Sequence, residues 1–213
     1  MNQRSAKLEQ YAQLVLERNR SMNLTAARDE IALWEHIDDS LTLLPYAGSP
    51  HVDVGSGAGF PGLVLAIAAG VAVTLVESVA KKARFLEEAA VALELEVTVL
   101  NARAEEVGRD PRYRGQFASA SARAVADAAT VLEYTLPLLR PQGVALLQRG
   151  TIEARERSAL ADAALVLGGT VEEDVVLPGS RERHIVFVRK TGVTSARFPR
   201  RAGMARKHPL CAE

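Results

Sequence analysis

A chain of 213 residues with 48% hydrophobic side chains is long enough for one α/β domain with an extension, and is too short for two large domains. Its single cysteine, Cys211, excludes an internal disulfide and a thiolate metal cluster, and its four scattered histidines lack ligand spacing, so no metal site is expected. The formal net charge is zero, no apolar run has membrane-spanning length and no apolar signal segment begins the chain, which predicts a cytoplasmic protein without a membrane partner.

Residues 1–48 predict a helical extension in front of a sheet. Residues 3–20 carry apolar side chains along one face, as in an amphipathic helix packed on a core. Thr25 or Asp29 is expected to cap a second helix, and a separate apolar stretch over residues 37–44 follows it.

Three polar residues, His36, Asp39 and Ser40, lie at helical spacing on one side of this extension. They either face a ligand cleft or form a structural or surface group. The pattern alone leaves both interpretations open.

The stretch HVDVGSGAGFPG at 51–62 predicts a buried strand that turns sharply into a helix. Glycine at positions 55, 57, 59 and 62 permits positive φ and close approach of a ligand to the backbone. Pro61 suits the first turn of the helix. A second strand over 71–76 ends on Glu77, about 20 residues past the turn, where a nucleotide-binding βαβ unit places the carboxylate that accepts hydrogen bonds from the ribose hydroxyls.

Two cofactor classes use this unit, because Gly57 to Gly62 also matches the dinucleotide pattern G-x-G-x-x-G. Asp53, two residues before Gly55, completes a run Asp-x-Gly-x-Gly-x-Gly. This run resembles the first motif of the class I S-adenosylmethionine-dependent methyltransferases, in which the acid helps to hold the amino-acid end of the cofactor. The run favours a methyltransferase over a nicotinamide or flavin enzyme, and over a glycine turn that binds nothing.

The rest of the chain alternates helices and strands, as in an open α/β sheet. Helices are expected over 78–95, 126–139 and 151–167, and strands over 97–100, 117–122, 144–148, 170–177 and 184–189, the last two as an antiparallel hairpin. The loop 101–107 follows a strand beside the cofactor, so Ala104 and Glu105 are expected to contact the adenine. Arg123 and Ala124 fall at the ligand-binding end of another strand. Five parallel strands and a terminal hairpin are the usual methyltransferase sheet.

The C-terminus differs in charge from the rest of the chain. From Arg183 to Ala212 there are eight basic residues and no acid, so the rest carries a net charge of about −8. A basic surface on an acidic body favours a polyanionic partner held through its phosphates, and a solvated basic tail is the alternative. The predicted organisation is a helical extension (1–48), a cofactor-binding domain (49–190) and a basic C-terminal tail (191–213).

Several longer motifs go beyond the fold class: Asn23-Leu24-Thr25, HIDDSL at 36–41, DVGSGAGFPG at 53–62, KKARFL at 81–86, ARAEE at 102–106, ARAVA at 122–126, RG at 149–150 and FPRRAGMARKHPL at 198–210. With them the sequence resembles the glucose-inhibited division protein B family, the bacterial small-subunit ribosomal RNA guanine-N7 methyltransferases, over nearly its whole length. Two positions depart from the family pattern. Ala118 stands where an acid is frequent, and Arg149 where a lysine is usual, which replaces a compact ammonium with a planar guanidinium.

The resemblance implies a fold, a cofactor and a set of site residues. The fold is that of a class I S-adenosylmethionine-dependent methyltransferase, Rossmann-like and doubly wound, with an N-terminal helical extension. The residues implied or indicated for S-adenosylmethionine are Asp53, Gly55, Gly57, Phe60, Glu77, Ala104, Glu105 and Arg123. Positioning candidates around the cleft are Asn23, His36, Asp39, Ser40, Arg123 and Arg149.

The implied reaction is direct in-line displacement, because guanine N7 has an exposed lone pair and no proton, so no general base is required. S-adenosylhomocysteine would be the product. The implied partner is 16S rRNA or the small ribosomal subunit, with Arg197, Arg200, Arg201, Arg206 and Lys207 on the RNA backbone. The alternatives are a non-catalytic RNA-binding ribosome assembly factor on the same fold and, third, a nicotinamide enzyme. The absence of a long exposed apolar stripe predicts a monomer.

Overall fold

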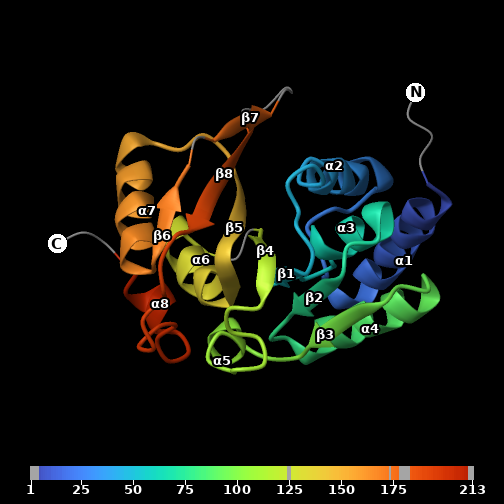
Figure 1. Cartoon of the computed structure of the whole chain (residues 1–213). Helices are drawn as coiled ribbons and strands as arrows, with labels where there is room; N and C mark the ends of the chain where they lie inside the picture. Colours follow the sequence, from blue (N-terminus) through green and yellow to red (C-terminus); the bar gives the residue numbers. More distant parts are fainter. Residues whose placement is uncertain (1–4, 124–125, 173, 178–182, 211–213) are drawn as a thin grey trace.

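The computed structural model describes residues 5–123, 126–172, 174–177 and 183–210, and arranges them as helices on both faces of one sheet (Figure 1). The helices are α1 (Ala6–Met22), α2 (Glu30–Leu41), α3 (Gly62–Ala69), α4 (Ala80–Ala92), α5 (Ala104–Val107), α6 (Ala128–Thr135), the 3-10 turn η1 (Leu136–Leu138), α7 (Ala154–Val166) and α8 (Met204–Lys207). The strands are β1 (His51–Val54), β2 (Val73–Val76), β3 (Val97–Leu100), β4 (Phe117–Ala122), β5 (Leu139–Arg149), β6 (Gly169–Val171), β7 (Val175–Leu177) and β8 (Arg183–Lys190).

The sheet has the strand order β3-β2-β1-β4-β5-β8-β6, and β7 also pairs with β8. Strands β1 to β5 run parallel, and β8 is antiparallel to each of its neighbours. β2 and β3 lie on one side of β1, and β4 and β5 lie on the other, so the order in which strands join the sheet reverses between β1 and β4. This reversal leaves a ligand-binding crevice at the carboxyl ends of the two strands. The predicted five parallel strands with an antiparallel ending are confirmed.

Each face of the sheet buries its own core. One face packs α1, α3 and α4 against β2 and β3, with Tyr11, Leu63, Leu75 and Leu86 fully buried. The other face packs α6 and α7 against the central and C-terminal strands. Figure 1 shows the two groups of helices on opposite sides of the sheet.

The N-terminal extension is two helices rather than three segments. Asp29 caps α2, because its Oδ1 accepts the Ala32 N–H at 2.8 Å, and the helix continues to Leu41. The apolar stretch expected separately over 37–44 is therefore the end of α2 and the turn after it. Buried Leu33 and Ile37 lie one turn apart on the same helical face, so one continuous helix buries both.

Several expected boundaries shift for local reasons. The helix expected to run to residue 139 ends at Thr135 and tightens into η1, because Pro137 supplies no N–H to an α-helix. The predicted loop at 101–107 contains the short helix α5. The predicted strand 170–177 is two strands, β6 and β7, that pair with opposite ends of β8.

The chain after β8 is packed on the body over its described part. Arg114 donates to the carbonyl oxygens of Thr194 and Phe198 at 2.8 Å, and Arg109 donates to that of Pro199 at 2.8 Å. Thr194 is buried as well. The segment predicted as a basic tail is thus folded against the body from Thr194 onward, and it ends in α8.

Candidate active site

Two cavities lie at the carboxyl ends of the parallel strands. The α5 cavity, of about 140 Å³, is lined by Val54, Gly55, Val76, Ser78, Ala102, Arg103, Ala104, Glu105, Ala126, Tyr134 and Arg206. The α2 cavity, of about 480 Å³, is lined by Leu24, Thr25, Ala26, Glu35, His36, Asp39, Gly55, Ser56, Gly57, Ala58, Phe60, Lys82, Arg123 and Arg183. Gly55 belongs to both linings, so the two cavities adjoin at the glycine turn.

The glycine turn has the backbone that the sequence predicts. Gly55, Gly57 and Gly59 have φ of 73°, 59° and 105°, which side chains with a Cβ rarely adopt. Gly62 is required for packing instead, because a Cβ there would lie 2.9 Å from the Asp53 Cβ and closer still to Leu75 Cδ2. The turn therefore brings bare backbone to the edge of the sheet.

Asp53 lies beneath this turn and not on a cavity wall. Its side chain is fully buried, with Oδ2 accepting the Gly62 N–H at 3.2 Å and Oδ1 accepting the Ser121 hydroxyl at 2.8 Å. Burial raises the pKa of Asp53 to about 6. Its visible contacts tie the glycine turn to β4, and the expected contact with a cofactor stays a prediction.

A polar network that the sequence did not indicate continues from Asp53. Ser121 Oγ lies 2.9 Å from His51 Nε2, and Ser119 Oγ lies 2.6 Å from His51 Nδ1. Burial lowers the pKa of His51 to about 3, so the ring is neutral. These bonds join β1 to β4 below the cleft.

Glu77 is where the βαβ pattern expects the ribose acid. One carboxylate oxygen accepts the Gly57 N–H at 2.9 Å and the other accepts the Val79 N–H at 2.7 Å. Asn101 Nδ2 donates to the Glu77 carbonyl at 2.9 Å. The carboxylate is held at the glycine turn between the ends of β1 and β2, and each oxygen keeps a lone pair for a ligand hydroxyl.

The α5 cavity brings together the predicted adenine contacts. Ala104 and Glu105 begin α5, and Glu105 is buried with Oε1 accepting the Gly203 N–H at 2.8 Å. Tyr134 faces them from α6, and burial, with the Glu105 charge, raises its pKa to about 12. The Glu105 carboxylate is thus shared between the cavity wall and the C-terminal segment.

Arg123 is the central cation of the α2 cavity. Its guanidinium carbon lies 4.9 Å from the centre of the Phe60 ring, and its Nη1 lies 3.6 Å from Asp39 Oδ2. Burial lowers the pKa of Arg123. The side chain is fixed over the glycine turn by a ring and a carboxylate.

Arg183 is a cleft residue that sequence analysis missed. Its Nη1 donates to Asp39 Oδ1 at 2.7 Å, so Asp39 lies between two arginines. Burial, followed by the Arg123 charge, lowers the pKa of His36, whose ring lies 5.7 Å from that of Phe60. The predicted group His36 and Asp39 therefore does face the cleft.

Other positioning candidates lie away from the cavity walls. Ser40 is fully buried and its hydroxyl donates to the His36 carbonyl at 2.7 Å, so it faces the core and the expectation that it faces the cleft is wrong. Asn23 ends α1 in a left-handed conformation, just before the lining residues Leu24 to Ala26. Arg149 donates to the Ala126 carbonyl at 3.2 Å and pairs with Glu156 at 2.5 Å, behind the α5 cavity. Ala124 lies outside the described residues.

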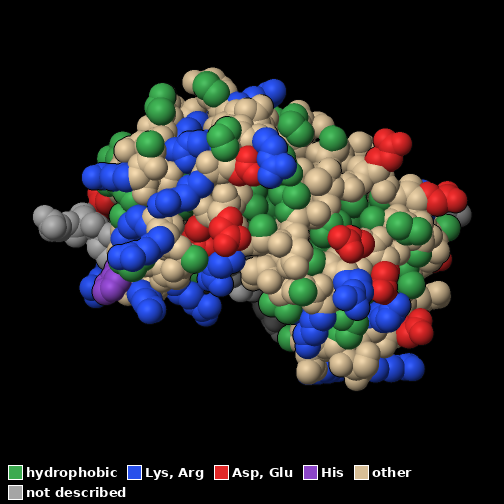
Figure 2. All heavy atoms as spheres, turned by 90° about the horizontal axis from the view of Figure 1, so that it is seen from below, with side chains coloured by type: hydrophobic (Ala, Val, Ile, Leu, Met, Phe, Trp, Pro, Cys, Tyr) green, Lys and Arg blue, Asp and Glu red, His purple; other side chains and the backbone are tan. Residues whose placement is uncertain are grey.

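The predicted RNA-contacting residues divide into two groups. Arg200 forms an ion pair with the fully buried Glu133 at 2.6 Å, which makes it structural, so its assignment to the RNA surface is corrected. The other four, Arg197, Arg201, Arg206 and Lys207, are exposed. Figure 2 shows Lys and Arg side chains gathered over the side of the molecule that carries α7 and α8.

Within the described parts of the chain, no group of three His, Cys, Asp or Glu side chains is placed to hold a metal ion. No helix among these residues is long and apolar enough to cross a membrane.

The strand order, the glycine turn after β1 and the acid after β2 define the fold of the class I S-adenosylmethionine-dependent methyltransferases. Among solved structures, the O-methyltransferase TomG from Streptomyces achromogenes, in complex with SAM, aligns with a TM-score of 0.59 at 14% identity, over 89% of this chain and 92% of that one. This likeness concerns the fold.

Sequence comparison identifies the family. A family model described as rRNA small subunit methyltransferase G matches residues 4–186. The protein named Ribosomal RNA small subunit methyltransferase G from Pelotomaculum thermopropionicum is 43% identical, with 96% of this chain and 90% of that protein aligned. Its namesake from Trichormus variabilis is 40% identical over the same shares. The chain belongs to the rRNA small subunit methyltransferase G family.

Proposed function

We propose that the protein transfers the methyl group of S-adenosylmethionine to N7 of a guanine in 16S rRNA and releases S-adenosylhomocysteine. Family membership makes it an rRNA methyltransferase that depends on S-adenosylmethionine. The choice of N7 is supported by the resemblance of motifs along the chain.

One observation carries the proposal: the two cavities adjoin at Gly55 and differ in character. The α5 cavity is walled by strand ends, and Glu77 is held beside its glycine turn, which suits an adenosine. The α2 cavity exposes cations over Phe60, which suits a base carried on a polyanion. The residues present therefore fit both substrates, with the point of transfer near Gly55.

The chain's own residues position the reaction and need not remove a proton. S-adenosylmethionine supplies an activated methyl group, and N7 supplies a free lone pair. Asp39 is engaged by Arg123 and Arg183, so it orients these cations. The lowered pKa of His36 keeps its ring neutral near pH 7, so it does not oppose the positive charge that a methylated guanine acquires. The proposed rate acceleration therefore comes from the proximity and alignment of the methyl group and N7.

The proposed partner is the 16S rRNA itself or the small subunit that contains it. Exposed Arg197, Arg201 and Lys207 would contact backbone phosphates. The helical extension, by residues 24–39, supplies one wall of the α2 cavity. A monomer working in the cytoplasm is the arrangement we propose.

The test is methyl transfer from labelled S-adenosylmethionine to small subunits and to their extracted RNA, followed by nucleoside analysis. Label in 7-methylguanosine that is lost in Glu77→Ala, and kept in the exposed control Glu88→Ala, is the expected result. Label in another nucleoside would overturn N7. No transfer despite cofactor binding would favour a non-catalytic assembly factor.

A further inference from the structure

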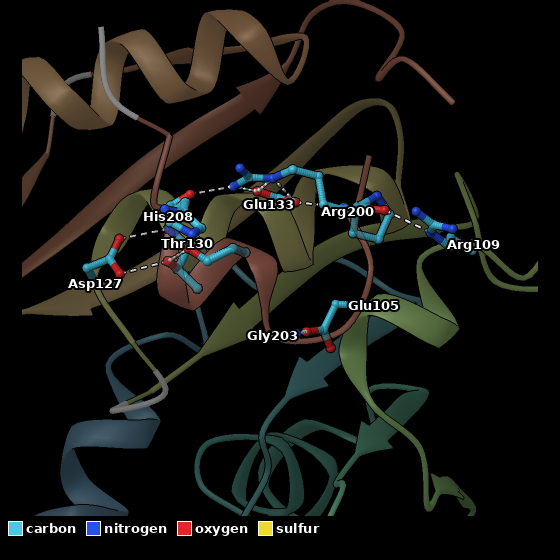
Figure 3. Close-up of polar contacts among 10 residues, drawn as sticks. Glu105, Arg109, Asp127, Thr130, Glu133, Arg200, Gly203 and His208 are labelled. Atoms are coloured by element: carbon cyan, nitrogen blue, oxygen red, sulfur yellow. Dashed lines mark hydrogen bonds and ion pairs between the residues drawn. The ribbon is translucent and has the colours of Figure 1, made fainter. Parts of the chain in front are cut away.

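The C-terminal segment from Arg200 to His208 is folded against α6 and approaches α5 (Figure 3). Its first anchor is Arg200, which donates to both carboxylate oxygens of Glu133 and, through Nη2, to the His208 carbonyl at 2.8 Å. A second anchor is Thr130, whose hydroxyl donates to the Ala205 carbonyl at 3.0 Å. The segment therefore has a fixed position relative to α6.

The third anchor reaches the α5 cavity itself. Gly203 N–H donates to Glu105 Oε1 at 2.8 Å, and Gly203 has φ of 80°, a conformation that suits glycine. Figure 3 shows Glu105 and Gly203 meeting where α5 approaches the C-terminal segment. The chain then enters α8 at Met204, two residues before Arg206.

Arg206 contributes to the cavity lining from α8, and Tyr134 contributes from α6. The Arg206 side chain is exposed, and among the described residues it forms no hydrogen bond and no ion pair, unlike that of Arg200 six residues earlier. A structural hydrogen bond or ion pair therefore does not account for the position of Arg206. A free planar cation at the edge of a cavity that ends in an aromatic ring is suited to a flat heteroaromatic ligand.

We propose that Arg206 is a cofactor-binding residue, which stacks its guanidinium on the adenine of S-adenosylmethionine, and that the C-terminal segment is a wall of the cofactor site. This inference rests on the proposed function. It separates Arg206 from its exposed neighbours Arg201 and Lys207, whose side chains line neither cavity and are left for RNA.

The proposal fixes which step the residue affects. Adenine does not change during methyl transfer, so a contact with it stabilises the bound substrate, the transition state and the bound product equally. Loss of the contact should raise KM for S-adenosylmethionine and leave kcat unchanged. It should also weaken the binding of S-adenosylhomocysteine by the same factor.

The experiment is isothermal titration of the full chain with S-adenosylmethionine and with S-adenosylhomocysteine, in the absence of RNA. Arg206→Ala is expected to raise both dissociation constants about 3- to 30-fold, the range of a cation–π contact. Arg206→Lys keeps the positive charge and loses the planar guanidinium, so its dissociation constants should lie between those of the wild type and those of Arg206→Ala. Lys207→Ala, on the adjacent exposed position of α8, should bind both compounds as the wild type does. Circular dichroism checks that each variant is folded.

The outcomes separate this inference from the proposed function. If the wild type binds S-adenosylmethionine and Arg206→Ala binds it equally well, the inference is wrong and the methyltransferase proposal stands. If Lys207→Ala loses as much affinity as Arg206→Ala, the effect comes from the loss of any positive charge on α8, and the stacking contact is refuted. If the wild type binds neither compound, the proposed function fails and this inference fails with it.

Discussion

The α5 cavity and the α2 cavity adjoin at Gly55 and are built from different kinds of surface. The α5 cavity is lined mostly by small and apolar residues at the ends of β1, β2 and β3, with Tyr134 on its wall. The α2 cavity has three cations, two acids and a histidine among its lining residues. Both are closed by segments outside the central sheet, from opposite ends of the chain.

The difference follows from what each cavity is proposed to hold. An adenosine is the same in every turnover, so groups in fixed positions, such as the Glu77 and Glu105 carboxylates, serve it. A guanine in RNA brings phosphates with it, so its cavity needs positive charge, which Arg123 supplies over Phe60. Variants in the α5 cavity and variants in the α2 cavity should therefore fail differently.

The largest effect is expected where the C-terminal wall of the α5 cavity is anchored. Arg200→Ala leaves the fully buried Glu133 without its ion-pair partner and with only the backbone N–H of residue 200 as a donor, which should lower the free energy of unfolding by about 3–5 kcal/mol. Chemical denaturation measures it. Arg201→Ala, which is exposed, should change the free energy by less than about 0.5 kcal/mol. Equal losses in both variants would mean that the anchor is not specific.

Arg123→Ala should show the opposite pattern, because the protein should still fold and its methyl transfer should become slower. The guanidinium fixes the geometry between Phe60 and Asp39, so we expect a fall in kcat of about 100-fold, the cost of misplacing reacting groups by about 1 Å. Single-turnover methyl transfer measures the step. Arg123 lines the α2 cavity and not the α5 cavity, so affinity for S-adenosylhomocysteine should fall much less than kcat, while the contact of Arg123 with S-adenosylmethionine that the family resemblance implies stays a prediction. A variant that loses this affinity as strongly as kcat would contradict the division between the cavities.

The two cavities also differ in how far the sequence predicts them. Gly55, Gly57 and Glu77 lie within one βαβ unit, so local spacing places them correctly. Arg183 and Asp39 are 144 residues apart, and their ion pair depends on the order of β5 and β8, which periodicity does not encode. Parts of the cleft that depend on chain topology were therefore missed.

The C-terminal wall of the α5 cavity was also not predicted from the sequence. Gly203 and Glu105 are 98 residues apart, and a charge count made Arg200 and Arg206 equivalent. Only the packed chain separates an arginine bound to Glu133 from one at the cavity edge. Charge composition predicted the basic face, and it had no information on which cations are free.

A smaller effect is expected below the junction of the cavities, at Asp53. Burial raises the folded pKa to about 6, above the ordinary value of 3.8, so the folded state keeps a proton that the unfolded state releases. This contribution to stability is complete below about pH 4 and is lost as the pH rises through 6, by roughly 2–3 kcal/mol. Asp53→Asn cannot titrate, so its stability relative to the wild type should rise between pH 4 and pH 7. Parallel stability profiles would show that Asp53 is not the titrating group.

The smallest effect concerns the ion pair that spans the α2 cavity. Asp39 and Arg183 are partly exposed, with 17% and 36% of their side-chain surface accessible, so solvent screens the pair. A double-mutant cycle with Asp39→Asn and Arg183→Gln, measured as kcat/KM for RNA, should give a coupling energy of about 1 kcal/mol. The surface pair Asp110 and Arg112, outside both cavities, should give a value near zero in the same assay. Additive effects of Asp39 and Arg183 would mean that each acts on the substrate alone, and that the α2 cavity is not organised by the contact between its two ends of the chain.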